Sequence, residues 1–403
     1  MNGFTVLDDP TGTVTARTTN PDGAATPRYA EFRLASPEVA LDAHGVRERL
    51  DVPSWDGPTV TAAARELLGR AASARWAGEP APILVGTIPF DPSRPAHLVV
   101  PAHQSWRPVA AASRRRTGDV AGAATHDLPG RDDAVFRAAV GRAVSRIEAG
   151  EAEKVVLART LDVSAPAPLD RAALRAAMRE ANPDAYVFDV ALPGGQGHLV
   201  GASPELLVSV RDGVLHSHPL AGSAPRSADP EEDRATAQRL LASEKDLREH
   251  AFVTDAIREV LRGFVEHDDD LDVPTTPELV ATSHLWHLGT PVTARLRPGT
   301  SVLDVVYALH PTPAVCGHPQ DVARELIGSL EPFDRGFYTG LVGWADQAGN
   351  GEWAIVLRCG VVRGADVRLF AGAGVVAGST PEAEHAETAV KLSTLLSALG
   401  GVA

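Results

Sequence analysis

Lysine is the rarest basic residue in this sequence, and its three copies are the first candidates for chemistry. Among the 38 lysines and arginines, only Lys154, Lys245 and Lys391 are lysine. Burial or a second cation lets a lysine amine lose its proton and act as a base, whereas arginine stays charged in proteins. Lys154 heads the apolar segment EKVVLART (153–160), which fits either a catalytic base or a structural residue. Lys245 is predicted to be a helix-surface residue.

Carboxylates on two predicted helices have the spacing of a cation site. Glu249 lies on the apolar stripe of SEKDLREHAFVTDAIREVL (243–261), four residues before Val253. A carboxylate there needs a cation or a proton, and a salt bridge at the edge of the stripe is the alternative. Glu384, Glu387 and Lys391 share one face of the last helix, although the last two also have the spacing of a surface pair. Inward carboxylates from two helices suit Mg²⁺.

Other polar residues interrupt apolar segments. Glu205 precedes two leucines in GASPELLVSV (201–210), so its pKa should rise as in a general acid, unless it only stabilises a turn. Arg358 interrupts the apolar strand AIVLRCG (354–360) and is expected to face an anion. His284 and His287 permit a shared metal, but without a third ligand a structural or substrate-contacting role is favoured over zinc. The glycines of LFAGAGVV (369–376) fit anion binding or, alternatively, a bulge or a tight strand crossing.

Alternating helices and strands must position these residues. Helices are predicted over residues 61–76, 132–149, 171–180, 231–265, 320–328 and 381–399. Strands are predicted over 82–91, 154–163, 186–192, 198–202, 206–210, 214–218, 340–345, 352–362 and 366–376, with hairpin turns in SVRDGVLHS and RCGVVRGADVRLF. Strand pairs with interspersed long helices favour a layered α/β or α+β fold. Residues 1–28 are predicted to be a flexible terminus, and 107–131 a polar connector.

Composition and net charge limit the classes of partner that the protein is expected to bind. The 403 residues are 44% apolar and 22% charged, as in ordinary globular proteins, and residues 29–403 are predicted to form one domain. A formal net charge of −14 argues against nucleic acid and anionic membranes as partners. The two cysteines, Cys316 and Cys359, allow one disulfide at most. No signal peptide or membrane-length apolar run is present, so a cytoplasmic location and a monomer are expected.

Ten segments together resemble the chorismate-utilising enzymes, which include isochorismate, anthranilate, aminodeoxychorismate and salicylate synthases. Besides EKVVLART and SEKDLREH these are GASPELL, HPLAGSAPR, SHLWHLGTP, LHPTPAVCGHP, EPFDRGFYTGLVGW, GEWAIVLRCG, LFAGAGVV and EAEHAETAVKLS. They follow the family's order over roughly residues 130–400, with PILVGTIPFD a weaker match upstream. The resemblance implies two layered, mostly antiparallel sheets flanked by helices, as in anthranilate synthase component I. It also implies a Mg²⁺-dependent site for chorismate.

The resemblance further implies a role for each residue that matches a family motif. Two residues would transfer protons, the general base Lys154 and the general acid Glu205. Glu249 and Glu387 would bind Mg²⁺ directly, and Glu384 would support the ion through water. The ring-carboxylate end of the substrate would contact Gly222, Ser223, Gly372 and Gly374. The enolpyruvyl side chain would contact Arg358, Tyr338 and Lys391, and the ring pocket would be lined by His287 and Ala314.

Details of the motifs imply a subgroup. Family members that use ammonia lack a lysine at the position of Lys154 and depend on a glutamine amidotransferase, so water is the implied nucleophile and no amidotransferase subunit is expected. AGSAPR (221–226), with PTPAVCG and SEKDLREH, resembles the isochorismate synthases of siderophore (2,3-dihydroxybenzoate) pathways. The implied reaction adds water at C2 of chorismate and expels the C4 hydroxyl. A salicylate synthase, which then eliminates pyruvate, and a non-catalytic chorismate-binding subunit are the alternatives.

Overall fold

The computed structural model describes residues 5–8, 14–17, 31–76, 78–109 and 133–400. Strands β1 (Thr5–Asp8) and β2 (Val14–Arg17) form an antiparallel pair that joins no other described strand. The rest of the predicted terminus 1–28 lies outside the described residues, as does the predicted connector from residue 110 onward. The flexibility of the terminus and the single domain over 29–403 therefore stay predictions.

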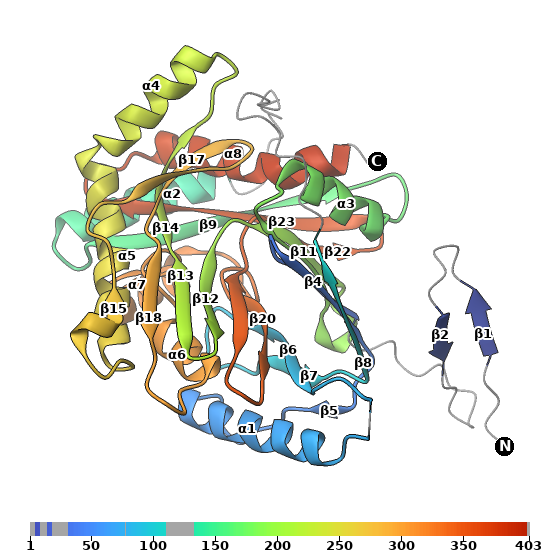
Figure 1. Cartoon of the computed structure of the whole chain (residues 1–403). Helices are drawn as coiled ribbons and strands as arrows, with labels where there is room; N and C mark the ends of the chain where they lie inside the picture. Colours follow the sequence, from blue (N-terminus) through green and yellow to red (C-terminus); the bar gives the residue numbers. More distant parts are fainter. Residues whose placement is uncertain (1–4, 9–13, 18–30, 77, 110–132, 401–403) are drawn as a thin grey trace.

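A nine-stranded antiparallel sheet, sheet I, carries the two longest strands (Figure 1). Its strand order is β19-β9-β23-β22-β11-β10-β3-β4-β8. In chain order its strands are β3 (Glu31–Ala35), β4 (Val39–His44), β8 (His103–Pro108), β9 (Lys154–Ser164), β10 (Tyr186–Ala191), β11 (His198–Ser203), β19 (Gly317–His318), β22 (Cys359–Arg363) and β23 (Asp366–Val376). β9 and β23 pair along their whole length, so residues at the start of β9 lie beside the end of β23.

A second nine-stranded antiparallel sheet, sheet II, has the order β15-β18-β13-β12-β21-β20-β6-β7-β5. Its strands are β5 (Glu48–Arg49), β6 (Ile83–Ile88), β7 (His97–Val100), β12 (Leu206–Arg211), β13 (Val214–His218), β15 (Leu271–Asp272), β18 (Val292–Arg295), β20 (Leu341–Asp346) and β21 (Gly351–Ile355). A smaller sheet III consists of β14 (Leu220–Pro225), β17 (Leu285–Gly289) and β16 (Glu278–Ala281).

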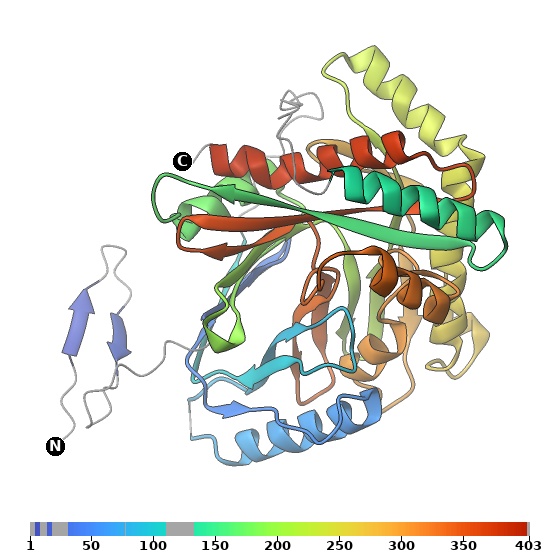
Figure 2. The same cartoon turned by 180° about the vertical axis from the view of Figure 1, so that it is seen from behind.

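Helices cover the outer faces of the sheets, as the two opposite views show (Figures 1 and 2). Sheet I is covered by α2 (Asp133–Glu148), α3 (Arg171–Ala181), α7 (Gln320–Leu330) and α8 (Pro381–Gly400). Sheet II is covered by α1 (Gly57–Ser73), α5 (Glu244–Arg262) and α6 (Val302–Leu309), and sheet III by α4 (Pro230–Leu241). Apolar helix faces bury against apolar strand faces, which is the driving force for this layering.

The chain crosses from sheet II to sheet I between β21 and β22. Apolar residues of both sheets, such as Phe188 and Trp344, form a shared core on one side of this crossing. At the crossing, Arg358 has a φ of 48°. β22 pairs with β23 only at residues 366–369, so no described strand borders residues 370–376 on that side. This uncovered edge of β23 and the crossing both border the candidate site.

The predicted fold class is confirmed: two layered, mostly antiparallel sheets flanked by helices. Both predicted hairpins form, β12–β13 and β22–β23. In the first, Asp212 and Gly213 both have positive φ, 51° and 76°, as its two-residue turn requires. Cys316 and Cys359 are both buried and free, so the one disulfide that the sequence permits does not form.

Two predicted elements are each two elements in the structure. The predicted helix 231–265 is wrong as a single helix, because Ser243 accepts a hydrogen bond from the N–H of Asp246 and caps a new helix, α5. The predicted strand 352–362 is wrong because it changes sheets at residues 356–358. The prediction also lacks α6, despite the Ser301–Asp304 capping box, and several short strands. One of these, β14, has the sequence LAGSAP, whose glycine and proline are typical of a turn.

Candidate active site

One cavity gathers the predicted site residues, from strands β14, β17 and β23, from helices α5 and α8, and from loops. Every predicted site residue except Lys154 and Glu384 lines it: Glu205, Gly222, Ser223, Glu249, His287, Ala314, Tyr338, Arg358, Gly372, Gly374, Glu387 and Lys391. Thr339 and six apolar residues complete the wall: Val156, Pro204, Leu220, Ala221, Val315 and Leu357. Charged groups on an apolar wall suit a small ligand that carries both anionic groups and a hydrocarbon ring.

Lys154 begins β9 and contacts one of the residues that line this cavity. Its side chain is 0% exposed, and its Nζ lies 3.0 Å from Oε1 of Glu249 on α5. This contact is an ion pair without hydrogen-bond geometry, so the amine has no hydrogen-bond partner among the described residues. Buried polar groups are normally hydrogen-bonded. Lys154 therefore retains donors for a water or ligand.

Each lysine of the chain contacts a different one of the three glutamates predicted to serve the metal. The pairs are Lys154 with Glu249 at 3.0 Å, Lys245 with Glu384 at 3.3 Å, and Lys391 with Glu387 at 2.5 Å. The prediction that Lys245 is only a helix-surface residue misses this contact: its side chain is 41% exposed, but that of Glu384 is 2% exposed. Lys391 also donates to the carbonyl oxygen of Gly372 at 2.9 Å. It therefore contacts strand β23 as well as Glu387, which a simple surface pair would not do.

The carboxylates of α5 and α8 influence one another. Burial raises the pKa of Asp246, and the charges of Glu249 and Glu387 raise it further. Burial and the charge of Glu387 likewise raise the pKa of Glu384. Burial also opposes ionisation of Glu387, but the cations Lys391, Lys245 and Arg358 together outweigh this effect and lower its pKa. Acidic groups held this close need counter-cations.

The donor set fits Mg²⁺ through two direct ligands. Among the described residues no group of three or more His, Cys, Asp or Glu side chains converges on one point, so neither a three-carboxylate site nor a zinc site with His284 and His287 is assembled. Mg²⁺ needs no such group, because it usually takes one or two carboxylates together with waters and substrate oxygens. Glu249 and Glu387 both line the cavity and would be that pair, and their role as ligands stays a prediction. Glu384 is engaged by Lys245 beside them.

Glu205 lies between β11 and β12 and is 3% exposed. Burial raises its pKa to about 7. The N–H of Leu220, 3.4 Å from its Oε1, and three cations oppose this rise: Lys154, Arg358 and Lys391. The direction of the shift agrees with the sequence-based expectation. A carboxyl that is partly protonated at neutral pH can donate a proton to a bound ligand.

Strands β14 and β17 place Gly222, Ser223 and His287 together. Ser223 and His287 are directly opposed, and Gly222 is the extra residue of a bulge with φ of 80°. Burial and the nearby cations Arg358 and Lys391 lower the pKa of His287 well below its ordinary value, so its ring is neutral. Its Nε2 is buried and has no hydrogen-bond partner within the described residues. This nitrogen belongs to a residue of the cavity wall and is available to a ligand.

Arg358 and Tyr338 supply a cation and a phenol to the same wall. No hydrogen bond or ion pair joins the Arg358 guanidinium to any other described residue. An unpaired arginine in a cavity is suited to bind a carboxylate, as the sequence led us to expect. Tyr338 is 3% exposed and its ring stacks on Phe370 with 5.1 Å between centroids. Burial raises its pKa, so the hydroxyl keeps its proton.

Gly372 and Gly374 make room for functional side chains. A Cβ on Gly374 would lie 2.3 Å from Oε1 of Glu249 and 3.2 Å from Cε of Lys154. A Cβ on Gly372 would lie 2.9 Å from the hydroxyl oxygen of Tyr338. Side chains therefore approach both glycines closely, and β23 pairs with β9 through them without the bulge that the sequence left open. Binding of an anion by their N–H groups stays a prediction.

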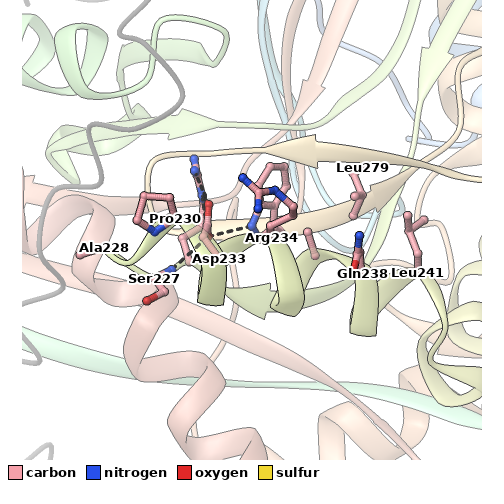
Figure 3. A pocket seen from close by; sticks show the side chains of 11 residues that line it. Ser227, Ala228, Pro230, Asp233, Arg234, Gln238, Leu241 and Leu279 are labelled. Carbon is pink, nitrogen blue, oxygen red and sulfur yellow. Dashed lines mark hydrogen bonds and ion pairs between the residues drawn. The ribbon is translucent and has the colours of Figure 1, made fainter.

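A larger cavity lies between α4 and sheet III, and it contains none of the predicted residues (Figure 3). Its buried carboxylate, Asp233, is saturated by the Arg226 guanidinium at 2.7 Å, the N–H of Ser227 at 3.0 Å and the indole N–H of Trp286 at 2.9 Å. None of its lining residues has a buried side-chain donor or acceptor without a partner. The first cavity has such groups nearby, and this difference points to it as the reactive site.

Comparison with known proteins identifies the family of the chain. A family model described as "Chorismate binding enzyme" matches residues 87–400. The chain belongs to this family. Among curated relatives of this chorismate-binding enzyme, isochorismate synthase DhbC of Bacillus subtilis is 42% identical and covers 92% of the chain and 93% of the relative. A putative isochorismate synthase MenF of Mycobacterium tuberculosis is also 42% identical, with 92% and 96% covered.

Solved structures extend the comparison to the fold of the chorismate-binding enzyme. A putative 2,3-dihydroxybenzoate-specific isochorismate synthase, DhbC of Bacillus anthracis, is similar with a TM-score of 0.83 and 39% identity, covering 92% of this chain and 96% of that one. Anthranilate synthase component I of Streptococcus pneumoniae has a TM-score of 0.65 at 21% identity, covering 94% and 95%, and shares the fold. None of the helices in the described residues has the length and apolarity to cross a membrane.

Sequence reasoning missed some residues of the site. Asp246 fits the pattern of an ordinary first-turn acid, but it shares the electrostatic environment of Glu249 and Glu387. Its position three residues before Glu249 was the available signal. Val315 and Leu357 line the cavity without any local signal. His318, which stands in the CGHP motif, stacks on Phe252 at 5.6 Å and is not among the lining residues.

Proposed function

We propose that this chain is an isochorismate synthase, a Mg²⁺-dependent isomerase that converts chorismate to isochorismate. Curated relatives with that name are 40% and 42% identical over 92% of the chain. The observation that carries the proposal is a pair of groups: the carboxyl of Glu205, which lines the cavity and has a pKa of about 7, and the buried amine of Lys154, which contacts Glu249 on the cavity wall. The reaction needs one group that accepts a proton and one that donates a proton.

Lys154 and Glu205 would perform the two proton transfers. Lys154 removes a proton from water as the water oxygen bonds to C2, and Glu205 protonates the hydroxyl that leaves C4 while the ring double bonds shift. One water enters and one leaves, so no oxidant or reductant takes part. Glu249, whose Oε1 lies 3.0 Å from the Nζ of Lys154, is also a proposed metal ligand, so the proposed base and the proposed metal site share a contact.

Other residues would bind and orient the two carboxylates of chorismate. Arg358 and Lys391, with the Tyr338 hydroxyl, would hold the enolpyruvyl carboxylate, since both cations belong to the cavity wall. Ser223 and the bulge at Gly222 would contact the ring-carboxylate end. Fixing both ends of the substrate places C2 and C4 relative to the catalytic groups and lowers the entropic part of the barrier.

A bound Mg²⁺ would supply positive charge beside the ring carboxylate. Glu249 and Glu387 would hold the ion directly, with Glu384 behind them. Bound there, it would neutralise and position the ring carboxylate of the substrate. His287, neutral and with an unpartnered Nε2, would contact the substrate ring together with Ala314.

The branch of metabolism is a finer proposal. The AGSAPR motif supports the siderophore (2,3-dihydroxybenzoate) type, as do the DhbC relatives. The MenF relative is as similar to the chain as the DhbC relative of Bacillus subtilis is. Overall sequence identity therefore does not favour the DhbC type over the MenF type. With water as the nucleophile, the chain would need no glutamine amidotransferase, and we propose a cytoplasmic monomer that acts alone on chorismate.

Product analysis tests the proposal. Purified protein is incubated with chorismate and Mg²⁺, and the products are separated by chromatography. Isochorismate is expected as the product. Salicylate with pyruvate would favour the salicylate synthase alternative, and anthranilate formed with ammonia would contradict the role of Lys154. Chorismate binding without turnover, in the presence of Mg²⁺, would favour a non-catalytic subunit.

A further inference from the structure

Lys245 has no task in the proposed reaction, yet it connects the two helices that carry the acidic residues of the site. It is the second residue of α5, and its Nζ lies 3.3 Å from Oε1 of Glu384 on α8. These two residues are 139 positions apart in the chain. The contact therefore exists because the fold brings α5 and α8 together.

The partner of Lys245 is a buried carboxylate. Glu384 is 1% exposed, and the charge of Glu387 adds to the cost of its ionisation. The charges of Glu384, Glu249 and Glu387 all act on the Lys245 amine. An exposed ion pair contributes little, but a buried carboxylate that loses its cation is costly. The pair thus has more to stabilise than a surface salt bridge does.

We propose that Lys245 is a positioning residue, a built-in counter-ion that holds Glu384 in the metal-free protein and opposes Mg²⁺ binding by charge repulsion. The inference rests on the proposed function, because it takes Glu249 and Glu387 as the ligands of Mg²⁺. Four carboxylates meet three ammonium groups in this region, with Asp246 as the fourth acid. Removal of one ammonium raises the excess of negative charge from one to two, which a divalent cation would relieve.

The test compares two variants of α5 that lose the same charge. Lys245→Gln removes the ammonium and keeps an amide that can donate a hydrogen bond to Glu384. Arg248→Gln removes an exposed cation one turn further along the helix, where Arg248 Nε donates only to the carbonyl oxygen of Glu244 at 3.2 Å. Mg²⁺ affinity is measured by calorimetry, and thermal stability is measured with the metal chelated, so neither readout depends on turnover.

Lys245→Gln is expected to bind Mg²⁺ about three- to tenfold more tightly than the wild type, and to melt at a lower temperature when metal-free. Lys245→Arg, which keeps the charge, and Arg248→Gln should stay near the wild type in both readouts. The gain in affinity should shrink in high salt, because Lys245 is partly exposed and its charge is screened.

Different results overturn the inference and the proposed function. If Lys245→Gln binds Mg²⁺ no more tightly than Arg248→Gln does, the inference fails, while Mg²⁺-dependent isochorismate formation by the wild type would leave the function standing. If the wild type binds no Mg²⁺ and turns over chorismate without it, the metal assignment fails and the inference fails with it.

Discussion

Two buried ion pairs contact strand β9, and they are built differently. In the pair of Glu331 and Arg335, both side chains are 2% exposed. Glu331 Oε1 accepts from the N–H of Ala158 at 2.7 Å, and Arg335 donates to two backbone carbonyls, at 2.7 and 2.9 Å. Lys154 is equally buried, but its amine has an ion pair with Glu249 at 3.0 Å and no hydrogen bond to a described residue.

The difference separates a structural charge from the charge of Lys154, which we propose to be reactive. Arg335 spends its donors on fixed backbone acceptors, and arginine does not give up its proton. Lys154 keeps unused donors beside a cavity, and lysine can give up its proton once its counter-charge moves away. Arginine is the ordinary basic residue of this chain, so the lysine at 154 is the exception in identity as well as in bonding.

The structural pair should respond to mutation through stability. Glu331→Ala leaves the buried Arg335 charge without its partner, so we expect a loss of about 3–5 kcal/mol in the free energy of unfolding. Urea unfolding measures it. Glu325→Ala removes an exposed acid from α7, the helix that ends just before Glu331, and should stay within about 0.5 kcal/mol of the wild type. A loss below about 1 kcal/mol for Glu331→Ala would contradict the structural role of the Glu331–Arg335 pair.

The proposed general acid, Glu205, should give the site a pH dependence that the structural pair lacks. The pKa of Glu205 is about 7 in the folded protein and 4.5 as its ordinary value. The folded state therefore binds the proton more tightly, and this contribution to stability is complete below pH 4.5 and lost as pH rises through about 7. The loss amounts to roughly 3 kcal/mol. Because the acid form is the reactive one, kcat/KM should fall above pH 7.

Unfolding at pH 5 and pH 8.5 measures this contribution. Glu205→Gln does not ionise, so its stability should fall less over that range than the stability of the wild type does. Equal pH dependence of the two proteins would mean that Glu205 titrates normally. A kcat/KM that stays constant from pH 6 to pH 9 would argue against Glu205 as the acid.

The reactive pair should be sensitive to space. Gly374→Ala places a Cβ against Glu249 and Lys154, so one of the two must move. We expect Mg²⁺ affinity and turnover to fall by about tenfold or more, which corresponds to about 1–3 kcal/mol of overpacking. Gly328→Ala, on α7 with nothing near its Cβ, is the matched control and should be neutral or slightly stabilising. Wild-type turnover in Gly374→Ala would mean that the contact is not functional.

Local patterns revealed the residues whose signal is local. Lys154 was found by its rarity and Glu205 by its apolar neighbours, and the ordered motifs supplied residues such as Tyr338 that no pattern marks. The layered fold followed from strand pairs and long helices. The ends of helices and strands were harder to predict from the sequence. For example, the cap at Ser243 divides an otherwise continuous helical pattern into two helices.

Contacts between distant elements could not be predicted. Lys245 and Glu384 each resemble surface residues, and their meeting depends on how α5 and α8 approach each other. Glu331 and Arg335 have the spacing of a surface helix pair, yet both are buried against β9. Burial is a property of the packed layers, and it decides whether a charge is structural, reactive or solvated.

The most direct test of the central claim is Lys154→Met, measured for turnover, chorismate binding and unfolding free energy in one protein preparation. Turnover should fall about 10²- to 10⁴-fold, because the base is lost. Chorismate affinity should remain within a few-fold of that of the wild type. The free energy of unfolding should remain within about 1 kcal/mol of the wild-type value, because Glu249 lines the cavity and can turn toward solvent. Retained turnover, or a loss explained by unfolding as expected for Glu331→Ala, would contradict the account.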